Sequence, residues 1–529
     1  MCPNKNTYDT LIVGSGSAGA ILATRLSEDP NRSVLLIEAG PDYPKFEDIP
    51  NEVKYGYARR ETSANWGHTR TPVSDHKWSF IARYTDEAMP GIVPRGKVVG
   101  GSSAVNAQIF LRGVPEDYDT WASWGNDLWS YRELLPYFRM IETDTNFDGD
   151  FHGQSGPIIV RRFDQEDWNK DQLAFYNGAI SLGYPDCPDH NLPDTTGVGP
   201  TPLNNPDGIR WSTAIGYLNN VRDRTNLTVM ADCLVHRVVF DGKKAVGVLA
   251  ESDGELVQYN AKEVILSAGA IGSPHLLLLS GVGPPSHLYD MDVPLVLGLP
   301  GVGENLRDHP QVWVSWRTRD DFEQPPGRPG IQVTLRYTAA DSHLPNDMLL
   351  HPSSRGIVGN RAVGPGSSEE YGLIMVVCLD LEVGSGSIRL RTNDPRIQPM
   401  LDYNFLEEEF DRQRMREGVR ICVELGEKKE WSELVTERVS PTDKDLSSDE
   451  RLDAWLRQWV QTSHHVSGTC KMGPDGDAMS VVDQFGNVRG LENLRIADAS
   501  IMPDCIRANT NVTSMVIGER VADFIRRGK

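Results

Sequence analysis

The sequence predicts an α/β fold, and three observations lead to this prediction. The N-terminal stretch YDTLIVGSGSAGAILATRL has the pattern of a buried strand, a glycine-rich turn and a helix. The stretch SVLLIEAG is a second buried strand that ends at an acidic residue. Two further β-branched apolar runs, EVILSAGA and NLRIADAS, begin at Glu263 and Asn493 and end in small residues. We therefore expect a Rossmann-like domain assembled from segments that lie far apart in the chain.

The glycine-rich turn is typical of dinucleotide binding. Gly14, Gly16 and Gly19 form the pattern GxGxxG, and residues 18–26 have the pattern of a helix. Gly14 permits the tight turn, Gly16 lets a pyrophosphate approach the backbone, and Gly19 lets the helix pack close to the strand. The helix N-terminus adds N–H groups and a positive dipole end for the phosphates.

The acidic residue at the end of the second strand narrows the choice of nucleotide cofactor. Glu38 follows Gly19 by 19 residues, where a carboxylate can accept hydrogen bonds from both ribose hydroxyls of an adenosine. A 2′-phosphate would be repelled, which disfavours NADP. Enzymes that use NAD usually keep this fold contiguous, whereas here its third strand begins more than 200 residues after Glu38. That spacing is typical of flavoproteins with an inserted substrate domain, and it predicts FAD.

Length and charge limit the remaining classes of function. At roughly 100–200 residues per domain, 529 residues allow two to four domain-sized units. The formal net charge of −21 argues against nucleic acid or an anionic membrane surface as a partner. No run approaches the ~18 apolar residues of a membrane-spanning helix. We expect no nucleic-acid partner and no membrane span.

The seven cysteines are scattered, odd in number and free of any CxxC pair. This usage predicts reduced thiols, and it predicts neither a disulfide framework nor a zinc site. The N-terminus lacks an apolar segment behind a basic one, so we expect no signal peptide and a cytoplasmic location.

Four blocks of the sequence resemble the glucose-methanol-choline (GMC) family of FAD-dependent oxidoreductases, nearest in pattern to choline oxidase and hydroxymethylfurfural oxidase. The first is the N-terminal GxGxxG with Glu38. The second, GKVVGGSSAVNAQIFLRGVPEDYD, and the third, GAIGSPHLLLLSGVG, are similar to the two signatures of the family. The fourth joins HHVSGTCKMG to ADASIMPDCIRANTNVTSMVIGERVAD. The blocks follow the order of the family over nearly the whole chain.

The resemblance implies two domains. Residues 1–155, 195–308 and 464–529 would form the FAD-binding domain. Residues 156–194 and 309–463 would form an inserted α+β substrate domain, a sheet backed by helices, that covers the reactive side of the flavin. The segments at 325–330 and 353–370 are rich in glycine and proline and are predicted to be loops. Trp66, Phe110 and His351 are possible pocket residues.

The resemblance also implies which residues contact FAD. Val235 would contact the adenine through its backbone, although a core-strand valine would look the same. Asn511 is a plausible N-cap of a C-terminal helix that begins near Thr513. Val105 stands where choline oxidase bonds a histidine to the flavin, so non-covalent FAD is expected. The full set of predicted cofactor contacts is Gly14, Gly16, Ser17, Ala18, Gly19, Glu38, Ala39, Val99, Gly101, Ser102, Asn106, Ala107, Val235, Ala268, Asp498, Ala499, Asn511 and Val512.

The paired histidines His464 and His465 raise the question of catalysis. Oxidation of an alcohol by hydride transfer needs an acceptor for the hydroxyl proton, and the pKa of histidine suits that task. By resemblance His465 fills this role, and Asn509, 44 residues later, binds the substrate oxygen. If the segment is extended, adjacent side chains point to opposite faces, so His464 would face away or toward the pocket wall. A metal site is not expected, since the other histidines lack HxxxH or HxH spacing.

The predicted function is therefore FAD-dependent oxidation of the CH–OH group of a small-molecule alcohol to a carbonyl. The electron acceptor is left open between O2, for an oxidase, and a quinone or redox protein, for a dehydrogenase. Two other activities occur on the same fold: a hydroxynitrile lyase, whose polar pair resembles two histidines, and a light-driven fatty-acid decarboxylase. The particular alcohol is not predicted, and either a monomer or a homodimer is expected.

Overall fold

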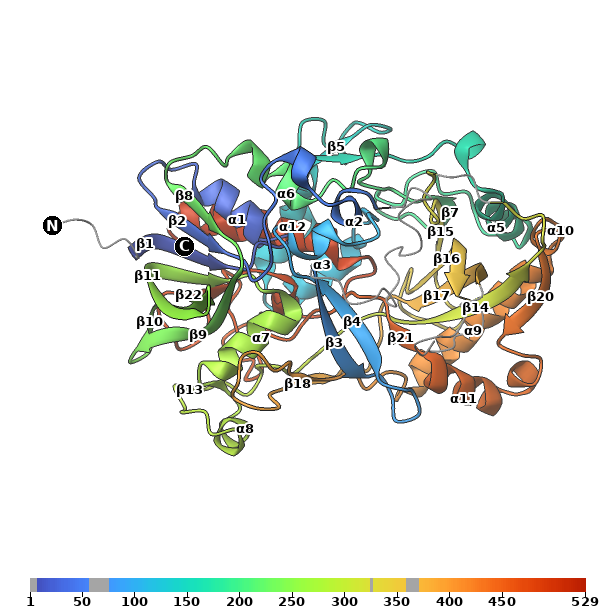
Figure 1. The fold of residues 1–529 in the computed structure, drawn as a ribbon. Helices are drawn as coiled ribbons and strands as arrows, with labels where there is room; N and C mark the ends of the chain where they lie inside the picture. The colour runs from blue at the N-terminus through green and yellow to red at the C-terminus, as the bar shows by residue number, and fades with distance from the viewer. Residues whose placement is uncertain (1–6, 57–75, 324–326, 358–370) are drawn as a thin grey trace.

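The computed structural model describes residues 7–56, 76–323, 327–357 and 371–529, and it builds them around two large sheets (Figure 1). The possible pocket residue Trp66 and most of the loop predicted at 353–370 lie outside these ranges. The start of that predicted loop is strand instead, because β16 (Met348–Ile357) pairs with β17 (Tyr371–Leu379).

The first sheet is the predicted nucleotide-binding sheet. Its strand order is β8-β2-β1-β11-β10-β9, with β22 beside β11. The strands β8, β2, β1, β11 and β22 run parallel, with Val13 opposite both Ile37 and Leu266. The strand β2 is a short apolar run in which every residue is buried, and β22 buries Leu494 and Ile496 on either side of the partly exposed Arg495. Burial of β2 on both faces is typical of a parallel sheet. The bounds are β1 Thr7–Val13, β2 Val34–Ile37, β8 Leu227–Met230, β9 Cys233–Asp241, β10 Lys244–Ser252, β11 Glu255–Leu266 and β22 Leu494–Ile496.

The second sheet is antiparallel, in the order β20-β14-β17-β16-β15-β7, with β21 beside β14. The helices α5, α9 and α10 lie near it on the right of Figure 1. The strand β7, inside the range expected for the FAD-binding domain, is an edge strand of this sheet. We therefore propose that the substrate domain includes it. The remaining bounds are β7 Gly197–Pro200, β14 Pro310–Thr318, β15 Val333–Tyr337, β20 Val435–Ser440 and β21 Gln461–Thr462.

A smaller sheet, β18-β19-β3-β4, connects the two regions, because β19 from the second half of the chain pairs with β3 from the first. Its strands are β3 Lys77–Arg83, β4 Gly91–Gly96, β18 Ser387–Arg389 and β19 Met400–Asp402. Two strand pairs complete the sheets: β5 Glu142–Asp144 with β6 Ile158–Val160, and β12 Val282–Gly283 with β13 Leu297–Gly298.

The helices cover both sheets, and none in the described part of the chain is long and apolar enough to cross a membrane. The helix α12 packs on α1, where Arg25 pairs with Glu519 at 2.8 Å. The helix bounds are α1 Gly19–Leu26, α2 Asn51–Lys54, α3 Pro115–Ser123, α4 Tyr131–Ile141, α5 Lys170–Ser181, α6 Thr213–Gly216, α7 Gly269–Leu279, α8 Pro285–Asp290, α9 Glu409–Glu427, α10 Lys429–Ser432, α11 Asp449–Trp459 and α12 Thr510–Arg526.

The predicted N-cap of the C-terminal helix is wrong by two residues. The cap position is Asn509, and its side chain makes no capping hydrogen bond. The side chain of Asn511 lies in the first turn, where its Oδ1 accepts a hydrogen bond from Ser17 Oγ at 2.7 Å. Both amides are directed toward other partners, because this helix begins at the functional site described below.

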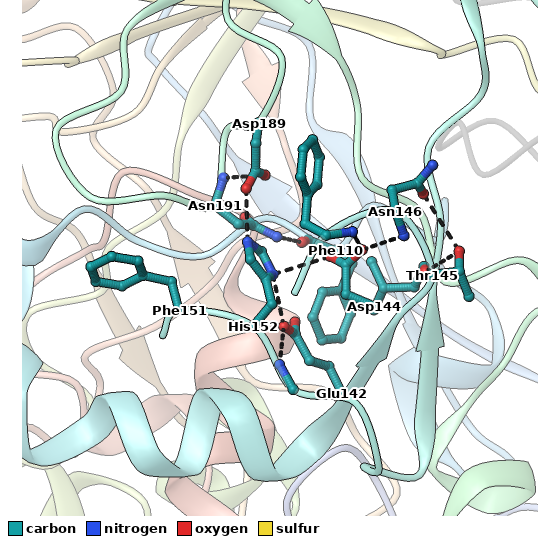
Figure 2. A network of polar contacts seen from close by, with 12 residues as sticks. Phe110, Glu142, Asp144, Thr145, Asn146, Phe151, His152, Asp189 and Asn191 are labelled. Atoms are coloured by element: carbon teal, nitrogen blue, oxygen red, sulfur yellow. Dashed lines mark hydrogen bonds and ion pairs between the residues drawn. The ribbon is translucent and has the colours of Figure 1, made fainter. Parts of the chain in front are cut away.

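A buried ion cluster joins β5 to the segment at 186–191 (Figure 2). The imidazole of His152 bonds Glu142 through Nδ1 at 3.0 Å and Asp189 through Nε2 at 2.8 Å. Arg162 bridges Asp144 and Asp189 at 2.8 and 2.6 Å. With Arg112 on Glu142 at 2.6 Å, three carboxylates face three cations when His152 is protonated. The cluster includes a trio of ligand-type residues, Glu142, Asp144 and His152, but its own cations already neutralise it.

Burial opposes a charge on His152, but its hydrogen bonds with Asp144, Asp189 and Glu142 prevail and raise its pKa to about 10. The folded pKa thus exceeds the ordinary 6.5. The stabilisation that this causes is complete below about pH 6.5 and is lost as the pH rises through about 10.

We predict that His152→Gln lowers the free energy of unfolding by about 3–5 kcal/mol at pH 6, because it leaves buried carboxylates with too few cations. Urea denaturation followed by circular dichroism measures this. The difference from the parent protein should shrink by pH 10. The control is His236→Gln, which removes a part-exposed pair with Glu251 and should cost less than about 1 kcal/mol. An equal deficit at both pH values would show that the protonated imidazole does not stabilise the cluster.

Candidate active site

Two adjoining cavities lie where the first sheet, the β3–β4 hairpin and the start of α12 meet. The first has a volume of about 260 Å³ and runs along the GxGxxG turn to Val235 and Asp498. The second, of about 150 Å³, contains both His465 and Asn509. They form one continuous site, because four residues line both: Ser17, Arg95, Ser102 and Ser514.

The turn at the first cavity has the geometry that its glycines predict. Gly14 has φ +94°, a conformation that favours glycine. A Cβ on Gly19 would lie 1.9 Å from the carbonyl oxygen of Gly14, so only glycine lets α1 pack here. A Cβ on Gly101 would lie 2.5 Å from the Cα of Gly16. Two glycine turns from different segments thus touch and form a cradle with little side-chain bulk.

A buried carboxylate, that of Glu38, lines this cradle. Glu38 follows β2 directly, and its Oε2 accepts hydrogen bonds from the N–H of Ser15 at 3.0 Å and its Oγ–H at 2.7 Å. Its Oε1 accepts from the N–H of Gly40 at 3.0 Å. Burial raises the pKa of Glu38, and the hydrogen bonds from Ser15 act in the opposite direction. These bonds fix the carboxylate where it can receive ribose hydroxyls.

A second buried carboxylate, that of Asp498, lines the same cavity. Asp498 follows β22, and its Oδ2 accepts hydrogen bonds from the N–H of Gly269 at 2.9 Å and from Ser273 Oγ at 2.5 Å. These bonds tie the end of β22 to the start of α7. Burial raises the pKa of Asp498. The first cavity is therefore held in shape by hydrogen bonds between three distant segments.

In the second cavity, His465 and Asn509 are in direct contact. Asn509 Nδ2 lies 2.8 Å from His465 Nε2, and both residues line the cavity. The expected pairing across 44 residues of sequence is therefore present in the geometry, although its catalytic role stays a prediction.

A third histidine, His309, contacts His465 through the ring nitrogen that does not face Asn509. His309 Nδ1 lies 2.8 Å from His465 Nδ1, and the ring centroids are 4.8 Å apart in an edge-on arrangement. The sheet positions both residues, because β14 pairs with β21 through Pro310 and Thr462. One carboxylate oxygen, Asp308 Oδ1, accepts the backbone N–H groups of both His309 and His465, at 2.7 and 2.8 Å.

The hydrogen bonds determine where the imidazole hydrogens lie. His309 Nε2 is 2.8 Å from the carbonyl oxygen of Ile506 and 2.9 Å from Cys505 Sγ. Because the carbonyl oxygen can only accept, we assign the hydrogen to Nε2. The Nδ1 of a neutral His309 is then an acceptor, and the Nδ1–H of His465 donates to it. That leaves His465 Nε2 with a lone pair directed at Asn509. This tautomer provides the cavity with a base at one defined atom.

Electrostatics keeps both rings neutral. Burial lowers the pKa of His465 well below 6.5, and the neighbouring His309, His464 and Arg95 lower it further. Burial also lowers the pKa of His309 to about 3. A neutral imidazole is the form that accepts a proton, so this environment favours a base at neutral pH.

The sequence of this chain is similar to the sequences of known proteins. Sequence profiles described as GMC oxidoreductase match residues 8–311 and residues 383–518. The chain belongs to the GMC oxidoreductase family. An oxygen-dependent choline dehydrogenase of Chromohalobacter salexigens is 36% identical over 543 residues, which cover 98% of this chain and 95% of that protein. An oxygen-dependent choline dehydrogenase of Escherichia coli is 35% identical with the same coverage.

Solved structures show the same fold over the full length. Pyridoxine 4-oxidase from Mesorbium loti superposes with a TM-score of 0.87 at 28% identity, covering 98% of this chain and 99% of that one. A fungal aryl-alcohol oxidase superposes with a TM-score of 0.83 at 25% identity, covering 99% of each chain. This GMC oxidoreductase is therefore an FAD-dependent enzyme that acts on CH–OH donors, and its fold class is the predicted one.

The first cavity fits FAD by its own features. The touching glycine turns admit a pyrophosphate, Glu38 can accept hydrogen bonds from ribose hydroxyls, and Val235 of β9 lines the same cavity. Near the second cavity, the buried Asn511 Nδ2 has no hydrogen-bond partner among the described residues. A donor of this kind suits a carbonyl oxygen of the flavin ring. Val105 lines this cavity and offers no atom for a covalent bond, so we propose that FAD is bound non-covalently.

Most predicted cofactor contacts line one of the two cavities, and three do not. The exceptions are Gly19, which packs the helix, and the buried Val99 and Val512. The residues that line the first cavity are Gly14, Gly16, Ser17, Ala18, Glu38, Ala39, Gly101, Ser102, Val235, Ala268, Asp498 and Ala499. Those that line the second include Asn106, Ala107 and Asn511.

Sequence patterns did not identify several residues of this site. Arg95 lines both cavities, and its Nη1 donates a hydrogen bond to the carbonyl of His464 at 2.6 Å. The sequence contains Asp308-His309-Pro310, but nothing in its spacing connects these residues to residues more than 150 positions later. Only the pairing of β14 with β21 in the structure makes the two segments neighbours.

The expectation that His464 faces away from the pocket rests on an extended backbone, and that premise is wrong. His464 has φ +70°, in the left-handed region, so side chains do not alternate there. Both His464 and His465 line the second cavity. His464 thus belongs to the pocket wall, which was the other option that the sequence left open.

Buried ion pairs hold the segment that carries Asn509. Asp117 accepts hydrogen bonds from the N–H and Nε–H of Arg507, at 2.8 and 2.7 Å. Arg336 donates to the Arg507 carbonyl at 3.2 Å. The turn that contains Ile506 and Asn509 is therefore held in place at Arg507, which lies between them. The positions of the Ile506 carbonyl and the Asn509 amide depend on the same contacts of Arg507.

We predict that Glu38→Gln weakens FAD binding by about tenfold or more, because an amide replaces the charged acceptor of the ribose hydroxyls. Titration of apoprotein with FAD, followed by quenching of flavin fluorescence, measures the dissociation constant. Glu47→Gln removes an exposed carboxylate outside the cavity and should leave the constant unchanged. Equal affinity in the Glu38 variant would place the adenosine elsewhere.

Proposed function

We propose that this enzyme oxidises the alcohol carbon of its substrate by hydride transfer, with His465 as the base for the hydroxyl proton and Asn509 as the donor to the hydroxyl oxygen. The observation that carries the proposal is the 2.8 Å contact between His465 Nε2 and Asn509 Nδ2 within one cavity that adjoins the FAD cradle. The lone pair of His465 Nε2 and the N–H of Asn509 are directed at each other, and a hydroxyl group, which both donates and accepts, can bind both when it enters between them.

The residues act in a defined order. The alcohol O–H donates to His465 Nε2, while Asn509 Nδ2–H donates to the alcohol oxygen and stabilises negative charge that develops there. His465 takes up the proton, and its Nδ1–H bond to His309 spreads the resulting positive charge. When bound, FAD supplies the hydride acceptor at its N5. The Asp308 carboxylate, with a pKa raised by burial to about 6, fixes the backbones of both histidines throughout.

The proposal covers an oxidase and a dehydrogenase alike, since both share the half-reaction at this site. The choline dehydrogenases among the relatives are named oxygen-dependent. Peroxide formation in air-saturated buffer, compared with reduction of a quinone or dye, separates the two acceptors. Anaerobic bleaching of the flavin by alcohols separates both from a lyase, which would leave the flavin oxidised.

We predict that His465→Gln slows flavin reduction by about 10²–10⁴-fold, because glutamine cannot accept the hydroxyl proton. Anaerobic stopped-flow absorbance with the best alcohol of a substrate panel gives the rate constant. His343→Gln changes an exposed histidine and should match the parent enzyme. An unaltered reduction rate in the His465 variant, with FAD bound, would refute the assigned role.

We also predict the pH dependence of flavin reduction. Burial and neighbouring positive charge lower the pKa of His465 well below 6.5, so the base stays deprotonated down to that pH. The rate constant for reduction should therefore be constant from pH 8 to about 6.5 and should fall only at lower pH. Stopped-flow measurements across this range provide the test. A half-maximal rate at pH 7 or above would contradict a neutral, desolvated base.

A further inference from the structure

Three buried side chains of types that bind metals lie behind the second cavity. The ligand atoms of His309, Cys378 and Asp380 all lie within 4.8 Å of one another. His309 directly precedes β14, Cys378 belongs to β17, and Asp380 directly follows β17. The pairing of β14 with β17 brings them together, with Gln311 opposite Cys378. We call this group the thiol trio, and sequence spacing could not predict it, because it depends on which strands are neighbours.

The thiol trio differs from the cluster around His152, in which arginines pair with the carboxylates. In the described ranges Asp380 forms no ion pair with a lysine or an arginine, and its contact with His309 Nδ1 is 3.6 Å long. Its buried Oδ2 has no hydrogen-bond partner among the described residues. Burial raises the pKa of Asp380 to about 7, although Arg336 acts in the opposite direction. A buried acceptor without a partner costs free energy unless a bound group supplies the missing contact.

His465 adds a fourth ligand atom to the thiol trio. His309 Nδ1 lies 2.8 Å from His465 Nδ1 and 3.6 Å from Asp380 Oδ1. Two ligands of a tetrahedral zinc ion, each about 2.0–2.1 Å from the metal, lie roughly 3.3 Å apart, which is between these two distances. Because the hydrogen of His309 is assigned to Nε2, which faces the Ile506 carbonyl, the lone pair of its Nδ1 is available to a metal.

The second cavity provides a route to the thiol trio. His465 and Ser463 both line this cavity. Ser463 Oγ lies 3.1 Å from Cys378 Sγ, so the thiol is directly behind a residue of the cavity wall. The route from the cavity to the thiol therefore runs past the Ser463 hydroxyl group.

From these features we propose that the thiol trio and His465 together bind a zinc ion. The ligand atoms are His309 Nδ1, His465 Nδ1, Cys378 Sγ and Asp380 Oδ1. Imidazole nitrogen, thiolate sulfur and carboxylate oxygen are all ligands of Zn²⁺, whereas Mg²⁺ prefers oxygen ligands. One thiolate and one carboxylate neutralise the two positive charges of the ion, so the buried site has no net charge.

The protons balance when zinc binds. Burial raises the pKa of the Cys378 thiol, but a bound metal ion outweighs burial, so the S–H bond breaks as the S–Zn bond forms. The released proton goes to solvent, and Asp380 likewise releases any proton that it carries. Zinc replaces the hydrogen on His465 Nδ1, and that hydrogen moves to Nε2 of the same ring.

Zinc at this site removes the base of the proposed reaction. With its hydrogen on Nε2, the ring of His465 has no lone pair there to accept the alcohol proton. This inhibition rests on the proposed function, whereas zinc binding itself does not. The two parts can therefore be tested separately.

The binding test uses the holoenzyme and three variants. Equilibrium dialysis gives the zinc affinity, and zinc X-ray absorption identifies the ligand atoms. The variants Cys378→Ser and Asp380→Asn each remove one proposed ligand. The matched control is Cys422→Ser, which removes another buried thiol, one whose pKa burial alone raises. The absorbance of bound FAD and urea denaturation show that each variant is folded.

The expected result is one tightly bound zinc ion per chain, with one sulfur at about 2.3 Å and nitrogen or oxygen at about 2.0–2.1 Å. Cys378→Ser should eliminate the sulfur signal and weaken binding by about tenfold or more, and Asp380→Asn should weaken it similarly. Cys422→Ser should retain both the signal and the affinity. Zinc bound without a sulfur ligand, or with equal affinity in Cys378→Ser, would overturn the inference and leave the proposed function intact.

The inhibition test is anaerobic flavin reduction by the best alcohol of a substrate panel, with each variant compared with its own rate without metal. Zinc should slow reduction by about tenfold or more in the parent and in Cys422→Ser, EDTA should restore the rate, and Mg²⁺ at the same concentration should have no effect. The slowing should be largely lost in Cys378→Ser. Zinc bound through sulfur with an unaltered reduction rate would support the site and contradict His465 as the base.

Discussion

The proposed chemistry of the site depends on one hydrogen bond, from His309 Nε2 to the carbonyl oxygen of Ile506. A carbonyl oxygen cannot donate, so this bond sets the tautomer of His309, and His309 in turn sets the tautomer of His465. The lone pair of His465 Nε2, which faces Asn509, is the last member of this series of hydrogen bonds. Three segments that are far apart in the sequence must meet within hydrogen-bond distance for the base to exist at one defined atom.

Much of the surrounding fold can be understood as the means of holding those segments. The pairing of β14 with β21 brings His309 beside His465, and Asp308 fixes both backbones through one oxygen. The Asp117–Arg507 pair fixes the turn that carries Ile506 and Asn509. Asp308, Asp117 and Arg507 are buried, and a buried charge is costly unless it is fully paired. This cost in folding free energy is consistent with a site whose geometry matters more than its contribution to stability.

Sequence reasoning reached the features that depend on local chemistry. The GxGxxG turn, Glu38 and the distant strands follow from glycine conformation, strand burial and the spacing of an acid, and the structure places them together. The pairing of His465 with Asn509 could be expected from the resemblance. The role of His309 could not, because it depends on which strands become neighbours. The sequence left two orientations open for His464, and the structure places it in the cavity wall. The extended backbone assumed for that segment is absent, because His464 has a left-handed φ.

The electrostatics of the pocket also lay beyond sequence reasoning. Lys77, Arg95 and Gln108 come from segments with no common motif, and only the fold brings them to one wall. The similarity to choline dehydrogenases extends along the whole chain, but overall similarity does not show which side chains line this wall.

The central claim, that neutral His465 carries its hydrogen on Nδ1 and leaves Nε2 free as the base, can be tested directly by NMR. The holoenzyme is labelled with ¹⁵N-histidine, and the His465 signals are assigned by their loss in His465→Gln. The account predicts a protonated Nδ1 and an unprotonated, hydrogen-bonded Nε2 at pH 7. A hydrogen on Nε2, or a doubly protonated ring at that pH, would contradict it.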